Sequence, residues 1–204
     1  MTDPVQYAFE KDGYVIIDDF LLDDVVDDLH RMAVNHTAID DVYPEDGYHS
    51  INYDKNNLPF PILSDIITAI HNEFSPLKNL EFDRGWAVVY NNTAKGVTPH
   101  ADPASINVNL WTTRLECVKD PTQNGLIIYD KKPPEEWTWK EYNCDVERIT
   151  KYLKESNAKP RYIPYQYNRI IIFDSKYFHR TNGVSMWGGE LSRRVNYTFM
   201  FNPV

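Results

Sequence analysis

The stretch Thr98–Trp111, TPHADPASINVNLW, constrains the fold more than any other part of the chain. Its second half alternates between two kinds of residue, with apolar Ile106, Val108 and Leu110 set against Asn107, Asn109 and Trp111. Alternation of this kind is typical of a strand whose two faces meet different surroundings. The pattern favours a barrel wall whose inner face holds a polar ligand, and an ordinary half-exposed strand is the alternative.

His100 and Asp102 stand just before this strand, two positions apart. Side chains at i and i+2 of an extended segment point the same way, so an imidazole nitrogen and a carboxylate oxygen could reach one metal ion. A further ligand must come from elsewhere, and the best candidate is His179 in the segment FDSKYFHR. Two histidines and a carboxylate are the facial ligand set of non-haem Fe(II) sites. The alternative is that these side chains are satisfied locally, as many such residues are.

The spacing of apolar residues changes near residue 80. Helical spacing predicts helices over 3–11, 22–36 and 61–74 and a later one over 144–156. Alternation and turn signals predict strands over 14–20, 81–91, 104–113, 125–130, 161–165, 168–174, 176–181 and 193–201. The segment 37–60 has no clear period, so we expect a loop that partly covers a site. Its aromatic and histidine side chains would serve as substrate contacts or as packing anchors: Tyr43, Tyr48, His49 and Tyr53.

Helices followed by many short strands are typical of an α+β chain in which helices buttress a β-sandwich or barrel. The 204 residues are enough for one sizeable core, and no internal repeat or low-complexity linker divides them. We therefore expect a single domain over 1–204. Within it, residues 1–79 are expected to form a helical support and lid, and residues 80–204 the β core.

A pair of arginines opens the terminal strand, SRRVNYTFMF. Alternation separates Arg194, Asn196, Thr198 and Met200 from Val195, Tyr197, Phe199 and Phe201. The second set suits packing on helices, which predicts that Arg194 points into the barrel. A buried arginine needs an anionic partner, and its guanidinium fork suits a carboxylate. No acidic side chain shares its strand face, so the pattern points to a ligand carboxylate; an exposed basic pair is the alternative.

The net charge and the cysteine count exclude some classes of function. The chain has 30 acidic and 21 basic residues, a net charge of −9, which argues against a general nucleic-acid or membrane-surface binder. Cys117 and Cys144 make no disulfide framework. No signal-peptide core is present, and no apolar run approaches the roughly 20 residues of a membrane span. We expect a cytoplasmic protein that acts on a small-molecule or peptide substrate, without nucleic-acid or membrane partners.

Taken together, these residues resemble the 2-oxoglutarate- and Fe(II)-dependent oxygenases. The order His100-x-Asp102, then His179, then Arg194 fifteen positions later looks like the family pattern. Four segments resemble one uncharacterised bacterial branch: PHADPASINVNLWTT, GLIIYDKKPPEEWTW, YNRIIIFDSKYFHR and RRVNYTFMF. The resemblance covers residues 80–202. It implies a double-stranded β-helix, a jelly-roll or cupin-like barrel, buttressed by the N-terminal helices.

The resemblance also implies roles for particular residues. His100, Asp102 and His179 would bind Fe(II) and form the catalytic centre. Arg194 would pair with the distal carboxylate of 2-oxoglutarate, with Arg193 as the runner-up because the strand register is inferred. Three further residues are expected to support the co-substrate: Tyr90 and Thr198, which match family positions, and Asn109, an amide on the polar strand face.

The implied reaction couples the decarboxylation of 2-oxoglutarate by O2 to the hydroxylation of an unidentified substrate. Halogenating relatives carry a small residue in place of the carboxylate ligand, so Asp102 favours hydroxylation. A cupin-like metalloenzyme without 2-oxoglutarate is the nearest rival, but it leaves Arg194 unexplained. A non-enzymatic jelly-roll binding module would need neither the three ligands nor a buried arginine. A zinc hydrolase could use the same ligands, although no general base is evident beside them.

Overall fold

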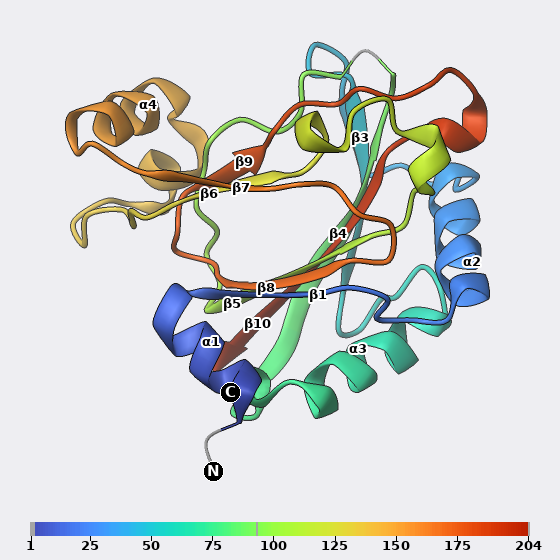
Figure 1. Ribbon diagram of the computed structural model, residues 1–204, viewed down its shortest axis with the longest axis horizontal. Helices are drawn as coiled ribbons and strands as arrows, with labels where there is room; N and C mark the ends of the chain where they lie inside the picture. Colours follow the sequence, from blue (N-terminus) through green and yellow to red (C-terminus); the bar gives the residue numbers. More distant parts are fainter. Residues whose placement is uncertain (1–2, 93, 204) are drawn as a thin grey trace.

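The computed structural model describes residues 3–92 and 94–203 (Figure 1). In these ranges the α-helices are α1 (Pro4–Asp12), α2 (Asp23–Val34), α3 (Ile62–Glu73) and α4 (Val146–Glu155). The strands are β1 (Tyr14–Ile17), β2 (Asp41–Tyr43), β3 (Tyr48–Asp54), β4 (Leu80–Tyr90), β5 (Ile106–Trp111), β6 (Leu126–Tyr129), β7 (Pro160–Ile163), β8 (Ile170–Asp174), β9 (His179–Thr181) and β10 (Val195–Pro203). A π-helix covers Lys140–Cys144. None of the helices described is long and apolar enough to cross a membrane.

Over the described residues, the strands pair in two antiparallel sheets. The larger sheet has seven strands in the order β1-β8-β5-β10-β4-β3-β2, and the smaller has three in the order β7-β6-β9. In Figure 1 the smaller sheet lies above β8, β5 and β1 of the larger one, with α4 beside its outer end. The expected α+β class with a jelly-roll barrel is confirmed by this arrangement.

One face of the large sheet, here called the outer face, packs against the N-terminal helices (Figure 1). The apolar stripes of α2 and α3 form this contact because residues three and four apart share a helix face. The strands supply every second residue, including Val108 of β5 and Phe199 of β10, both fully buried. The expected alternation of β10 is therefore confirmed: its helix-facing side chains are Val195, Tyr197, Phe199 and Phe201.

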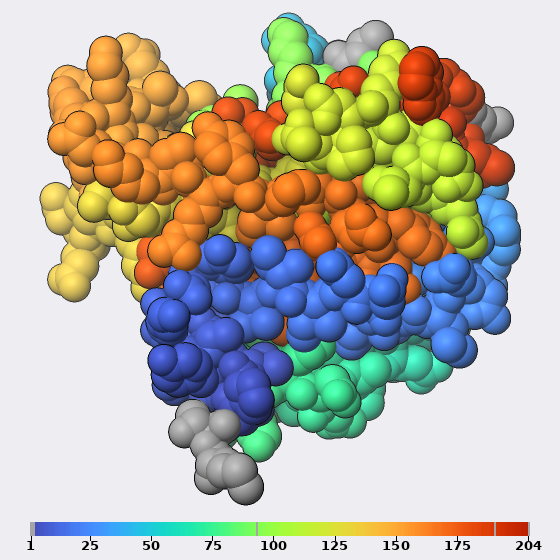
Figure 2. Space-filling view, in the orientation of Figure 1, coloured from blue at the N-terminus to red at the C-terminus, as the bar shows by residue number. Residues whose placement is uncertain are grey.

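Local signals explain where α1 begins and ends. The Asp3 carboxylate accepts a hydrogen bond from the Val5 N–H at 2.9 Å, and Pro4 occupies the first turn. Gly13 ends the helix with a φ of 76°, and its N–H donates to the Phe9 carbonyl oxygen. Glycine suits this left-handed position because it has no Cβ. The chain then enters β1, which pairs with β8; Figure 2 shows this blue segment lying against orange residues.

The segment 37–60, expected to be a loop, contains the hairpin of β2 and β3. The expected division at residue 79 was also too simple, because β1, β2 and β3 all belong to the large sheet. β3 pairs with β4 along its whole length, from Tyr48 opposite Tyr90 to Asp54 opposite Arg84. The sequence did not predict β3, because this strand is polar on one face and many turn-forming residues flank it.

Candidate functional site

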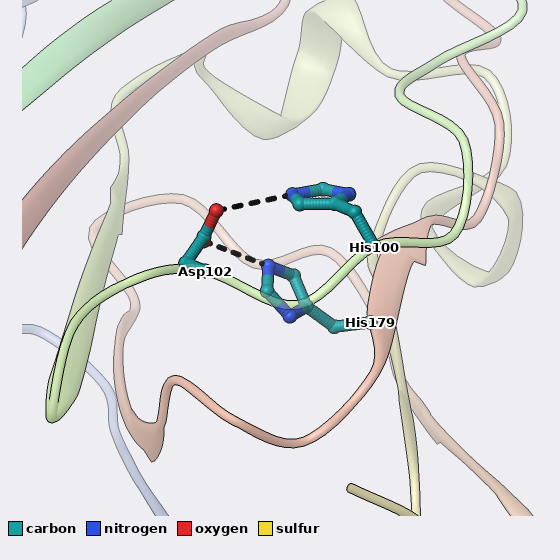
Figure 3. A group of neighbouring side chains, drawn as sticks. All are labelled: His100, Asp102 and His179. Carbon is teal, nitrogen blue, oxygen red and sulfur yellow. Dashed lines mark ion pairs between the residues drawn. The ribbon is translucent and has the colours of Figure 1, made fainter. Parts of the chain in front are cut away.

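His100, Asp102 and His179 converge on one point, as Figure 3 shows. The Nε2 atom of His179 lies 3.2 Å from one Asp102 oxygen, and that of His100 lies 3.7 Å from the other. Backbone pairing brings the two histidines together: each N–H donates to the other's carbonyl oxygen, at 3.0 and 2.8 Å. In the part of the chain that the structure describes, no other cluster of three His, Cys, Asp or Glu side chains could hold a metal.

The spacing of these atoms suits a divalent ion. Nitrogen and oxygen ligands bind such ions at about 2.0–2.2 Å, so two ligands at right angles lie about 3 Å apart. The His179–Asp102 distance is close to this value, and the three ligand atoms lie within 4.8 Å of one another. Three protein ligands on one side leave the remaining positions open for other molecules.

Each histidine is oriented through its second ring nitrogen. The Nδ1 atom of His100 lies 2.7 Å from the Thr98 carbonyl oxygen, and that of His179 lies 2.9 Å from the Tyr177 carbonyl oxygen. A carbonyl only accepts, so Nδ1 is the donating nitrogen in both rings, and Nε2 is the nitrogen that faces Asp102 and is placed to bind a metal ion. This is the arrangement that holds a histidine ready to bind a metal.

Asp102 is 2% exposed, and two amides hold its carboxylate in place. Asn107 donates to Oδ2 at 2.5 Å, and Asn143 of the π-helix donates to Oδ1 at 3.4 Å and to the Ala101 carbonyl oxygen at 2.9 Å. Burial by itself raises the pKa of Asp102, but the neighbouring His100 and His179 and the Asn107 amide outweigh it and hold the pKa at about 2. The carboxylate is therefore ionised and ready to act as a ligand.

The inner face of the large sheet, which is the face opposite the helices, is largely polar. Strand register places its side chains in rows that cross β3, β4, β10 and β5. The two central rows are Ser50, Val88, Asn196 and Trp111, and Asn52, Trp86, Thr198 and Asn109. Most of these residues, together with the three candidate ligands, line a cavity of about 910 Å³. That volume is within the range of small-molecule sites.

Arg194 lies on the inner face beside Tyr90 and is 2% exposed. Its Nε donates to the Asn124 carbonyl oxygen at 2.8 Å, and its guanidinium lies 4.9 Å from the centre of the Tyr90 ring. Its Nη1 is buried without a hydrogen-bond partner, and no carboxylate in residues 3–92 or 94–203 lies within ion-pair distance of it. A buried cation in this state is costly unless a further anion pairs with it.

The other expected co-substrate residues have different surroundings. Tyr90, Asn109 and Thr198 all line the cavity. The Tyr90 hydroxyl lies 3.1 Å from Thr181 Oγ1, and the Thr198 hydroxyl donates to Asn109 Oδ1 at 2.9 Å. Neither arginine is among the residues that line the cavity, but the Arg194 guanidinium packs on the ring of Tyr90, which does line it. The charge of Arg193 acts instead on His49, which belongs with Val89 to a helix-facing row. The geometry therefore favours Arg194 over Arg193 as the inward-facing arginine.

Two residues that hold Asp102 were absent from the expected site. The sequence could have predicted the role of Asn107, because this residue lies on the polar face of its strand and follows Asp102 by five positions. It could not have predicted the role of Asn143, because this residue lies in a π-helix whose position beside Ala101 depends on the tertiary fold. Of the side chains expected as substrate contacts or packing anchors, Tyr43, Tyr48 and Tyr53 line the cavity and His49 does not.

Comparison with known proteins establishes the fold. The sequence matches no protein-family profile and no curated protein. Among solved structures, this chain is similar to SnoN, described as a non-heme α-ketoglutarate dependent epimerase from nogalamycin biosynthesis. The TM-score is 0.72 and the sequence identity 12%, and the match covers 98% of this chain and 82% of SnoN. HygX from Streptomyces hygroscopicus, with nickel and 2-oxoglutarate bound, has a TM-score of 0.66 and 10% sequence identity, and the match covers 100% of this chain and 88% of HygX. A Pseudomonas putida prolyl-4-hydroxylase has a TM-score of 0.60 and 13% sequence identity, and the match covers 98% of this chain and 97% of the hydroxylase.

Proposed function

We propose that this protein is a non-haem Fe(II) dioxygenase that couples oxidative decarboxylation of 2-oxoglutarate to hydroxylation of a further substrate. One observation carries the proposal: a three-ligand site and a buried guanidinium without an anionic partner occur on one barrel interior. A metal-binding module or a cupin-like enzyme without 2-oxoglutarate uses the three ligands but leaves Arg194 buried and unpaired. The similar structures support the proposal, since HygX binds 2-oxoglutarate and SnoN is described as dependent on it.

The residues present fit both groups. His100, Asp102 and His179 would hold Fe(II) through two nitrogens and one oxygen, a set suited to that ion. Arg194 would take the distal carboxylate of 2-oxoglutarate on its free Nη1, with the Tyr90 ring against the guanidinium. Thr198 and Asn109 offer a hydroxyl and an amide on the cavity wall between. When bound, iron and 2-oxoglutarate together supply the activation of O2.

The protein's own part is to orient these groups and to limit water. The backbone carbonyls of Thr98 and Tyr177 fix the two imidazoles, and Asn107 and Asn143 fix the carboxylate. Fixed ligands need no rearrangement during the reaction, which is a principal source of catalysis in such sites. The apolar residues around Arg194 keep its guanidinium dry, which strengthens its attraction for a carboxylate.

Hydroxylation is the outcome that we propose, because Asp102 fills the place where a halide would otherwise bind. One oxygen atom of O2 would enter succinate and the other the substrate, with CO2 released.

We also propose a cytoplasmic location, which agrees with two free cysteines, Cys117 and Cys144.

The test is conversion of 2-oxoglutarate to succinate by the Fe(II)-loaded protein, with ascorbate supplying the two electrons that no organic substrate provides. We expect succinate to form in proportion to O2 consumed, and to be lost in His179→Ala. A protein that binds Fe(II) but forms no succinate above the His179→Ala background would overturn the proposal. Once a substrate is found, incorporation of labelled oxygen from O2 distinguishes hydroxylation from ring closure or epimerisation.

A further inference from the structure

The outer end of the cavity carries an excess of negative charge. Asp40, Asp41 and Asp54 line it, and within residues 3–92 and 94–203 none of them is in an ion pair. Two of the carboxylates accept hydrogen bonds from Asn52: Asp40 Oδ2 from its backbone N–H at 2.6 Å and Asp41 Oδ2 from its side-chain amide at 2.8 Å. Of the basic residues lining the cavity, Arg84 is neutralised by Asp83 at 3.0 Å, which leaves Lys55 against three aspartates.

A row of tyrosine rings also lines the cavity, beginning with Tyr43 on β2, the strand that carries Asp41. Tyr43 is 41% exposed and stacks on Tyr48 with 4.6 Å between ring centres, and Tyr48 meets Tyr90 at 5.5 Å. All three line the cavity, and Tyr90 ends the row at Arg194. The face of an aromatic ring attracts cations because its π-electrons are negative. The aromatic row, which runs from β2 through β3 to β4, and the aspartates therefore select for the same charge.

The inner end of the cavity has a buried acceptor without a donor. Asn107 is 1% exposed and lines the cavity, and its Oδ1 has no hydrogen-bond partner among the described residues. Its orientation is set by Asp102: the amide NH2 must face the carboxylate, so Oδ1 must point away from it. A 2-oxoglutarate dianion has only acceptor oxygens and cannot satisfy this atom. A substrate hydroxyl or amine can.

From these three observations we infer that the primary substrate is a small organic cation rich in hydrogen-bond donors, such as an amine-bearing sugar or polyol. The inference rests on the proposed function, since it names the substrate class of the same site. The ammonium groups lie against Asp40, Asp41 and the Tyr43–Tyr48 stack, and a hydroxyl or amine beside the reacting carbon donates to Asn107 Oδ1. The cavity volume favours a small molecule over a folded partner.

The test measures binding rather than turnover. Kanamycin A, an amino-trisaccharide, and its fully N-acetylated form share ring skeleton and hydroxyls but differ in charge. Their affinities for the zinc-loaded, 2-oxoglutarate-supplemented protein are measured by calorimetry at low and at physiological salt. We expect kanamycin A to bind and the acetylated form to bind at least about tenfold more weakly, with the difference shrinking as salt rises.

Two variants locate the effect. Asp40→Asn/Asp41→Asn keeps acceptor oxygens for Asn52 and should weaken kanamycin A binding about five- to thirtyfold, as expected for two partly exposed charge pairs. Asp65→Asn removes an exposed charge from α3, behind the outer face, and should change nothing. If the double variant does not fold, Asp54→Asn takes its place, since an asparagine there can still accept from Asn56 and Asn57.

Each outcome decides the inference. Equal binding of the two probes, no binding of either, or equal loss in Asp65→Asn overturns it. Selective binding of kanamycin A that depends on the cavity aspartates supports it, and so does stimulation of succinate formation by the bound amine. Failure of the proposed function is seen separately, as an absence of succinate from the iron-loaded protein whether or not the amine binds.

Discussion

The two faces of the seven-stranded sheet are built from the same strands but differ in the side chains that they bury. On the outer face, Val195, Tyr197, Phe199 and Phe201 of β10 are all fully buried against apolar side chains and helices. On the inner face, Arg194, Asn196, Thr198 and Met200 are equally buried, but Arg194 and Asn196 each have a polar atom without a partner. On the outer side of β10 the one polar side-chain group, the Tyr197 hydroxyl, donates to the Leu29 carbonyl oxygen, so that side needs no further partner. The inner side of the same strand is completed by what binds there.

The comparison predicts that outer-face substitutions reduce stability and that inner-face substitutions reduce binding. The largest expected effect on stability is that of Phe199→Ala. Phe199 packs against Tyr53, Phe82 and Tyr197, and its removal should lower the free energy of unfolding by about 3–5 kcal/mol. Urea denaturation measures this. Metal affinity measured in the folded fraction should stay as in the parent protein, and a parallel loss of metal affinity would show that the faces are not separable.

Arg194→Ala tests the inner face. It should weaken the binding of 2-oxoglutarate by about 2–5 kcal/mol, because a carboxylate would then be buried without a partner. Arg194→Lys should recover only part of this, since an ammonium does not reproduce the guanidinium fork. The measurement is the apparent affinity for 2-oxoglutarate in succinate formation. Arg193→Ala is the matched control; if it is the more damaging substitution, the inward-facing arginine has been assigned one position too late.

Asn107→Ala separates the ligands from the groups that orient them. Without the amide, Asp102 loses its shortest hydrogen bond and the metal affinity should fall by about 10–100-fold. Asn109 lies on the same strand face as Asn107 but does not contact Asp102. The control substitution Asn109→Ala should therefore leave the affinity for Zn(II) unchanged. Competition with a fluorescent chelator gives both values, and equal affinities in the two variants would contradict the orienting role of Asn107.

The smallest expected effect concerns pH. His30 of α2 is buried, and its burial lowers its pKa, partly opposed by the hydrogen bond of Nε2 to the Leu191 carbonyl oxygen at 2.9 Å. In the unfolded chain its pKa returns to about 6.5, so the unfolded chain binds the proton more readily. Stability should be full above that pH and should fall as the pH drops below it. His30→Gln should flatten this dependence in denaturation curves from pH 7.5 to 5.5; an unchanged slope would exclude His30 as its source.

The sequence predicted the outer face better than the inner one, and the reason is physical. Apolar periodicity reports burial in a core, so α2, α3 and the alternation of β5 and β10 were found from it. The π-helix residue Asn143 and the hairpin of β2 and β3 have no such period, because hydrogen bonds and register with distant strands hold them in place. His100, Asp102 and His179 were found because short spacing on an extended chain restricts their geometry. The state of Arg194 could be inferred only from the absence of an acid on its strand face.

The central claim is that the inner face binds iron and 2-oxoglutarate together, and an anaerobic titration tests it most directly. Fe(II) is added to the metal-free protein, followed by 2-oxoglutarate, while the visible spectrum is recorded. We predict a charge-transfer band that saturates with one equivalent of each. The band should be absent in His179→Ala and should need far more 2-oxoglutarate in Arg194→Ala. An iron-loaded protein that shows no band at any 2-oxoglutarate concentration, or the same titration curve in Arg194→Ala as in the parent, would contradict the account.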